Sequence, residues 1–171
     1  ITTNGYNACF GYHAGYDLQE GAHGNTLVGS TAGLAVTTGY QNTALGRQSL
    51  EALTTGIKNT SLGQGSGYAA TTASGSVFIG KDAGATVTTG NQNIAIGEDA
   101  MTGGTTPGDN NIAIGVSAGD ALTSGKDNVF MGRDAGGATT DVDGTVIIGA
   151  NAGGANMTAD ADHTIAIGIA A

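Results

Sequence analysis

Asn93-Ile94-Ala95-Ile96-Gly97 and Asn111-Ile112-Ala113-Ile114-Gly115 are two copies of the five-residue pattern that decides the fold of this chain. The pattern is a polar residue, three mostly apolar residues and a glycine, and it recurs ten times in 171 residues. We call its ten closing glycines the hook glycines: Gly11, Gly29, Gly46, Gly63, Gly80, Gly97, Gly115, Gly132, Gly149 and Gly168. The intervals between them are 18, 17, 17, 17, 17, 18, 17, 17 and 19 residues. A fixed period this short indicates stacked coils rather than one globular core.

The repeat is numbered here from its polar residue, so that the hook glycine is position 5. Positions 2 and 4 share one face of a strand and position 3 points to the other, and all three columns are mostly aliphatic. A strand that is apolar on both faces is expected to be buried on both. One face can pack inside the coil of the chain itself, and we expect the other to pack against a second copy of the chain.

The rest of each repeat reads as turns and corners. Glycine at position 5 suits a sharp turn with positive φ or a close approach of two backbones, and position 8 is always Ala or Ser. Positions 6 and 7 vary without a common charge, which indicates outward corners; examples are Arg47, Lys81, Glu98, Asp99 and Arg133. Stacking of identical positions also predicts an amide ladder along Asn7, Asn25, Asn42, Asn59, Asn93, Asn111 and Asn128.

These features predict an all-β fold, a β-solenoid or β-roll with about 17 residues per coil and a rise of about 4.8 Å per coil. Residues 1–171 are then a single repeat array of ten coils, which we expect to be a segment of a longer fibrous protein. Hexapeptide helices, calcium-binding nonapeptide rolls and helical repeats have spacings that this chain lacks. Each coil has too few apolar side chains for a sizeable core, which again favours a homotrimer or another close oligomer.

Composition narrows the classes of partner. The chain has 14 acidic and 5 basic residues, a net charge of −9, so nucleic acid and anionic membrane surfaces are not expected partners. We expect no membrane insertion in this segment, because no stretch approaches the length of a membrane span. The lone Cys9 has no partner for an intrachain disulfide and is expected to be a small buried thiol.

The pattern Asn-[Ser/Thr/Ile]-x-[Ile/Leu]-Gly-x-x-[Ala/Ser], clearest in residues 93–100 and 111–118, resembles the trimeric β-roll repeats of bacterial autotransporter adhesin heads and of bacteriophage tail fibres. The Thr-Thr-Gly segment of many coils departs from it as an insertion. The resemblance implies a trimer, a rigid projecting rod and attachment to a surface. A cell-surface glycan or protein receptor and an extracellular, cell-surface or virion location follow from the same likeness. It leaves a phage fibre and a bacterial adhesin as alternatives.

Several other groups of residues suggest alternative functions. A regular threonine array is a hypothesis for ice binding: Thr37, Thr54, Thr71, Thr88, Thr105, Thr123 and Thr139. We favour the structural interpretation, in which their hydroxyls hydrogen-bond to backbone groups of the turns and to one another. Aromatic residues near the N-terminus suggest glycan binding or, as we prefer, a cap over the first coil: Tyr6, Tyr12, His13 and Tyr16.

Candidate chemistry is sparse. Oxygen ligands near the C-terminal end suggest a Ca²⁺ site, although their spacing matches no known loop and polar turn residues are the preferred interpretation: Asp141, Asp143, Asp160 and Asp162, with His163. The histidines His13, His23 and His163 lie far apart in the repeat order, and no catalytic motif occurs. We therefore expect a structural protein without enzymatic activity, cofactor or assigned metal.

Overall fold

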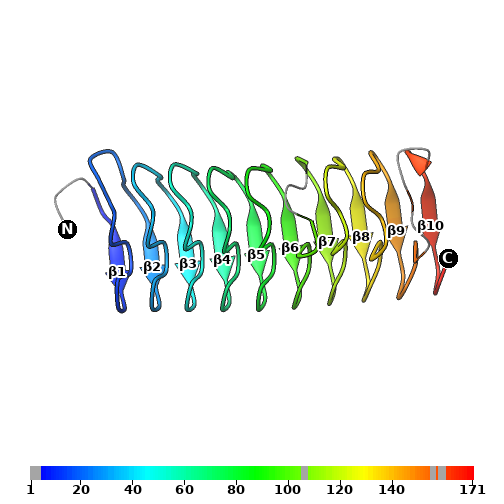
Figure 1. Cartoon of the computed structure of the whole chain (residues 1–171), viewed down its shortest axis with the longest axis horizontal. Helices are drawn as coiled ribbons and strands as arrows, with labels where there is room; N and C mark the ends of the chain where they lie inside the picture. Colours follow the sequence, from blue (N-terminus) through cyan, green and yellow to red (C-terminus); the bar gives the residue numbers. More distant parts are fainter. Residues whose placement is uncertain (1–4, 105–107, 155–156, 158–160) are drawn as a thin grey trace.

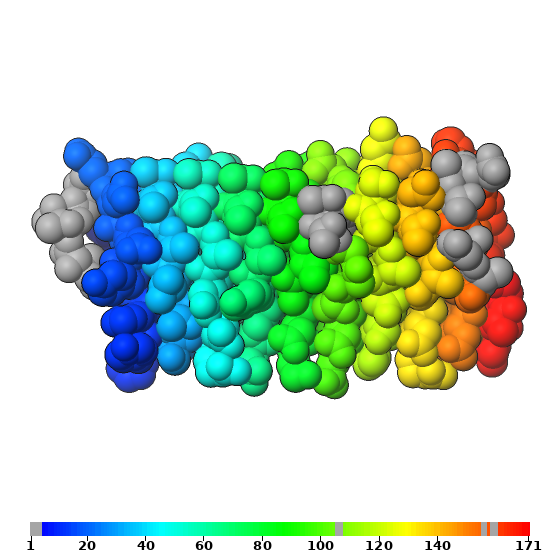
Figure 2. Space-filling model, viewed as in Figure 1, coloured from blue at the N-terminus to red at the C-terminus, as the bar shows by residue number. Residues whose placement is uncertain are grey.

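The computed structural model describes residues 5–104, 108–154, 157 and 161–171. The chain forms a long, narrow rod in which one coil follows the next, with the two termini at opposite ends (Figures 1 and 2). An all-β solenoid with about 17 residues per turn is therefore confirmed.

Ten strands of three residues each make a single parallel sheet that runs along one side of the rod in the order β1 to β10 (Figure 1). Every strand occupies positions 2 to 4 of its repeat, as the pattern predicts. The strands are β1 Ala8–Phe10, β2 Thr26–Val28, β3 Thr43–Leu45, β4 Thr60–Leu62, β5 Val77–Ile79, β6 Ile94–Ile96, β7 Ile112–Ile114, β8 Val129–Met131, β9 Val146–Ile148 and β10 Ile165–Ile167.

The register of the sheet matches identical repeat positions on neighbouring strands. Thr43 lies beside Thr60 and Leu45 beside Leu62, and the same pairing holds where the interval is 18 or 19 residues. The extra residues are therefore absorbed outside the strands. Each strand contacts only the strand before and the strand after it, so the fold is held together by nearest neighbours.

Position 3 points into the coil and is fully buried from β2 to β9. Positions 2 and 4 point outward and are half-buried or exposed on all ten strands. The single chain therefore buries the face that is expected to pack inside the coil. It leaves open the face that is expected to pack against a second copy, because none of the described segments returns to cover the outer side of the sheet.

Large and small side chains complement one another inside the rod. Phe78 at position 3 lies between Gly67 and Gly84, and a Cβ on either glycine would come closer than 3.0 Å to its ring. Where position 9 instead carries a buried Leu50, position 3 of the same coil is Ala44. The same rule relates Phe130 to Gly119 and Gly136, and Met101 to Ala95. This matching of volumes gives a well-packed interior with few apolar residues per coil.

The ten hook glycines all have positive φ, between 129 and 142°. For nine of them, from Gly11 to Gly149, a Cβ would lie closer than 3.0 Å to the backbone of the next hook glycine. Both the backbone conformation and the contact between coils therefore exclude a side chain at this position.

The predicted amide ladder is present. Asn42 Nδ2 donates to Asn25 Oδ1 at 3.1 Å and to the Gly56 carbonyl oxygen at 2.9 Å. Its own Oδ1 accepts the backbone N–H and the Nδ2 of Asn59, both at 3.0 Å. Ser76 interrupts the ladder. Its hydroxyl oxygen still accepts the backbone N–H of the next coil, Asn93, at 3.2 Å, which is one of the two hydrogen bonds that an asparagine Oδ1 accepts. These buried amides tie each turn to the next where no strand exists.

Replacing Gly97 by Ala should lower the free energy of unfolding by several kcal/mol, since the methyl group meets the Gly115 backbone and the left-handed conformation alone costs about 1–2 kcal/mol. Gly75→Ala is the matched control, because Gly75 has φ of 68° but its Cβ would be 3.4 Å from the nearest atom. Chemical denaturation measures both variants. Equal losses would show that the close approach of the coils contributes nothing.

Asn42→Ala should lower the free energy of unfolding by about 3 kcal/mol, because it leaves buried partners on Asn25, Gly56 and Asn59 unsatisfied. Asn42→Ser should lose less, since a hydroxyl in this column still accepts the N–H of the next coil, as Ser76 does. The order is measured by urea unfolding of both variants. A serine variant as unstable as the alanine variant would contradict the ladder's role.

Candidate functional site

The outer side of the sheet runs along the whole rod, and we call the side chains at positions 2 and 4 of the ten strands the outward face. It carries no charged residue. Position 2 contributes Ala8, Thr26, Thr43, Thr60, Val77, Ile94, Ile112, Val129, Val146 and Ile165. Position 4 contributes Phe10, Val28, Leu45, Leu62, Ile79, Ile96, Ile114, Met131, Ile148 and Ile167.

The outward face exposes large apolar side chains on two interior strands, β3 and β8, as well as at the ends of the rod, and it is half-buried on β4 to β7. Leu45 is 50% exposed and Met131 is 41% exposed, although both lie on interior strands. At the ends, Phe10 and Ile167 reach 79% and 66%. Position 4 is apolar on all ten strands, so an unbroken apolar column runs along a chain whose net charge is −9.

The predicted corners lie beside the outward face. Arg47, Lys81, Glu98 and Arg133 at position 6 are exposed, as expected for solvated corners. Lys81 Nζ lies 3.3 Å from Asp82 Oδ2 and 3.3 Å from Glu98 Oε1. The hydrogen bond to Asp82, and to a lesser extent the one to Glu98, raises the pKa of Lys81. Position 7 is less exposed than expected, because residues such as Asp82 and Asp99 adopt positive φ and lie back against the coil.

Most threonines of the predicted array form an inner column of the turns. The hydroxyls of Thr37, Thr54 and Thr71 donate to backbone carbonyl oxygens of the next coil at 2.9–3.1 Å. Thr123 donates in the same way to the carbonyl of Thr140, so the prediction that Thr139 belongs to this column is wrong. In that coil the threonine pair is shifted by one residue and Thr139 is buried. Thr105 lies outside the described residues, and Thr88 accepts the Thr71 hydroxyl at its carbonyl.

A second column beside it is exposed on the surface: Thr38, Thr55, Thr72, Thr89, Ser124 and Asp141. The inner hydroxyls therefore hydrogen-bond to backbone carbonyl groups, as the structural interpretation of the array proposes. The described members of the outer column are exposed in a single row, whereas the inner column is half-buried except at Thr123, which is exposed.

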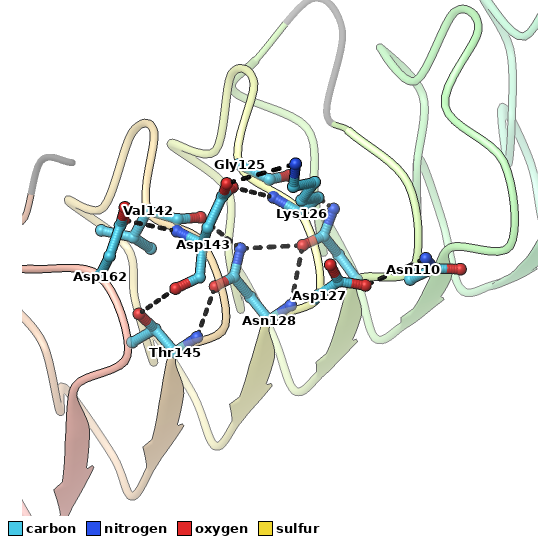
Figure 3. A network of polar contacts seen from close by, with 10 residues as sticks. Asn110, Gly125, Lys126, Asp127, Asn128, Val142, Asp143, Thr145 and Asp162 are labelled. Carbon is cyan, nitrogen blue, oxygen red and sulfur yellow. Dashed lines mark hydrogen bonds and ion pairs between the residues drawn. The ribbon is translucent and has the colours of Figure 1, made fainter.

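The acidic residues near the C-terminal end form a second ladder instead of a cluster of ligands (Figure 3). Asp143 Oδ1 accepts the Lys126 backbone N–H at 2.9 Å, and Asp162 Oδ1 accepts the Asp143 N–H at 2.8 Å. Ser74, Asn91 and Asp109 accept backbone N–H groups at the same repeat position in earlier coils. The carboxylates of Asp143 and Asp162 therefore act as hydrogen-bond acceptors for backbone N–H groups.

The remaining members of the proposed calcium site do not join this ladder. Asp141 is exposed, His163 lies two residues before β10 with positive φ, and Asp160 lies outside the described residues. No group of three or more His, Cys, Asp or Glu side chains within the described segments is placed to hold a metal ion.

The aromatic residues near the N-terminus gather as predicted. The Tyr12 and His13 rings stack with centroids 3.9 Å apart, and Tyr16 lies 4.7 Å from His13. However, Tyr6, Tyr12 and Tyr16 are 98, 69 and 67% exposed. The expectation of a cap over the first coil is wrong for these side chains, because side chains that are so exposed cover little of that coil.

Sequence reasoning missed a hollow of about 350 Å³ on the corner side of β7 to β9, lined by Asp120, Asp134, Gly137, Ala138, Asn151 and Gly154. It exists because Gly137 and Gly154 replace the larger side chains that earlier coils carry at position 10, such as Leu34 or Tyr68. Burial, and then the nearby Asp134 carboxylate, raise the pKa of Asp120. Two carboxylates alone do not make a metal or catalytic site.

The other candidate residues lie apart. The ring centroids of His23 and Tyr40 are stacked 4.6 Å apart, whereas His163 lies just before β10, the last strand of the sheet. Cys9 is half-buried, and burial raises the pKa of its thiol. The described part of the chain contains no helix with the length and apolar character that spanning a membrane requires.

Comparison with models of protein families, with curated proteins and with solved structures finds no match to this chain. The resemblance to adhesin and fibre repeats therefore depends on the residue pattern alone.

Asp143→Asn should leave the melting temperature nearly unchanged, because the amide oxygen still accepts the Lys126 N–H and the lost surface ion pair contributes about 0–1 kcal/mol. Asp143→Ala should lower the free energy of unfolding by about 1 kcal/mol, because that acceptor is gone. Millimolar Ca²⁺ should not stabilise the protein. A calcium-dependent rise in melting temperature that Asp143→Asn abolishes would instead establish a metal site.

Proposed function

We propose that this chain is a rigid rod segment of a fibre or adhesin, and that copies of the chain assemble through the outward face. The observation that carries the proposal is the uncharged, largely apolar stripe along all ten strands, which nothing in the described part of the chain covers. The stripe measures about 43 by 10 Å on the ordinary spacings of strands and residues. That area matches the largest apolar patches of soluble monomers, which are commonly interaction sites.

A second copy of the chain is the partner that fits this surface. The stripe repeats with every strand, about every 4.8 Å, and a partner must carry the same spacing to remain in contact along the whole rod. Another copy has that spacing by construction. The absence of charge from the outward face also lets copies with a net charge of −9 approach on the one side where they do not repel.

A trimer is the assembly that we propose. The outward face is two side chains wide, and in a ring of three each column can face a different neighbour. The resemblance to trimeric β-roll repeats supports the same number. Three coils at each level would then enclose a shared apolar core, which offsets the small core of the single chain.

The mechanical part of the proposal follows from the stacking. Every coil bonds its neighbours through strands, amide ladders and turn backbones, which suits a rod that projects from a surface and resists unfolding. We propose a location outside the cell or on a virion, and a cell-surface glycan or protein as the receptor of the whole fibre. No enzymatic activity, cofactor or nucleic acid is part of this proposal.

The alternatives from the sequence are less well supported. Ice binding would need free hydroxyls in a broad array, and the inner threonines donate theirs to the backbone. Glycan binding by the segment itself has one observation in its favour, the exposed stack of Tyr12, His13 and Tyr16. That stack is confined to one end of the rod, whereas the outward face follows its whole length.

Sedimentation equilibrium tests the proposal. The unmodified chain should sediment at three times the chain mass, and Ile114→Asp should not assemble, because an unpaired buried charge costs several kcal/mol. Ser124→Asp is the matched control: it adds the same charge to the same coil at an exposed position outside the outward face, and it should still assemble. A folded, monodisperse monomer of the unmodified chain would overturn the proposal.

A further inference from the structure

The outward face changes composition along the rod, and only one of its two columns carries the change. At position 2 the residues are Thr26, Thr43 and Thr60 on β2 to β4, but Val77, Ile94, Ile112, Val129 and Val146 on β5 to β9. We call these the threonine part and the aliphatic part. Position 4 stays aliphatic throughout β2 to β9. The difference is therefore a property of one side of the stripe.

The threonine part has no evident role in the fold of the single chain. Thr26 is exposed and Thr43 and Thr60 are half-buried, and all three point away from the interior. Threonine and valine share a branched shape and both suit strands, so the backbone does not distinguish them. The extra hydroxyl therefore matters chiefly to whatever packs on the outside.

Against an apolar partner surface, threonine and valine differ strongly. A hydroxyl that leaves water needs a hydrogen-bond partner, and Val and Thr are not an interchangeable pair in a packed core. In a symmetric assembly the hydroxyl occurs once per copy at each level, so its effect is multiplied. Contact between copies should be weaker along β2 to β4 than along β5 to β9.

We infer that the outward face is divided into an anchor and a release end, an inference that rests on the proposed assembly of copies. The aliphatic part holds the copies together, and the threonine part is where they separate first. The partner is another copy of this chain, and the dividing line lies between Thr60 on β4 and Val77 on β5. The rod thus has a built-in direction of opening, from its N-terminal coils.

Hydrogen exchange of the assembled full chain, followed by mass spectrometry, tests this inference. Strands at equal distance from the two ends are compared, β2 with β9, β3 with β8 and β4 with β7, so that fraying at the ends cancels. Backbone amides of β7 to β9 should exchange about tenfold or more slowly than their counterparts in β2 to β4, since local opening controls the rate.

Two triple valine variants separate the outward face from the general effect of replacing threonine, and a third triple variant makes the reverse change. Thr26→Val/Thr43→Val/Thr60→Val should slow exchange in β2 to β4 to the level of β7 to β9. Thr38→Val/Thr55→Val/Thr72→Val makes the same replacement in the same coils, in the exposed column outside the outward face, and should leave the difference intact. Ile112→Thr/Val129→Thr/Val146→Thr should speed exchange in β7 to β9.

The possible failures are distinguishable by running sedimentation on the same samples. Equal exchange in the paired strands of an assembled protein, or equal effects of the two valine variants, would overturn the divided face while leaving the proposed assembly standing. A monomer in sedimentation would overturn both. Faster exchange in β7 to β9 than in β2 to β4 would show that the direction of opening is the reverse.

Discussion

The close approach of successive coils at the hook glycines is the constraint on which the rest of the structure depends. From Gly29 to Gly168, each hook glycine N–H donates to the position 4 carbonyl of the preceding coil at 2.7–2.9 Å. This contact leaves no space for a Cβ, and it fixes the separation of the coils at the spacing of a parallel sheet. The strand register, the asparagine ladder and the straight outward columns all follow, because each requires identical positions to lie directly above one another.

The sequence predicted the features that repeat with the period. The strand at positions 2 to 4 and the stacking of asparagines depend only on which residues recur every 17 to 19 positions, and residues such as Asn42 and Gly97 show that directly. The left-handed backbone at Gln48, Leu50 and Lys58 was not predictable, because neighbouring coils carry glycine or unrelated side chains at those positions. Tertiary stacking imposes this conformation against the local preference of each residue.

Features that depend on the differences between coils were also missed. The match between Phe78 and its two flanking glycines needs knowledge of which coil faces which side of a ring, and the hollow beside Asp120 exists only because two later coils lack a side chain. The roles of some polar residues were also not predicted correctly from the sequence. Asp143 and Asp162 read as possible metal ligands, yet each accepts a backbone N–H from the coil before it. A carboxylate that replaces an amide in a ladder looks like a site when the stacking is unknown.

A fold in which each strand contacts only its two neighbours has no fixed number of coils. Duplication or loss of one repeat by recombination within the gene would add or remove about 4.8 Å of length without creating a new kind of contact. The restriction is the volume rule of the interior: a coil with a ring such as Phe130 has to follow one that offers a glycine like Gly119. The chain can thus be regarded as a molecular ruler, whose graduation is one coil and whose permitted lengths are set by which coils can be neighbours.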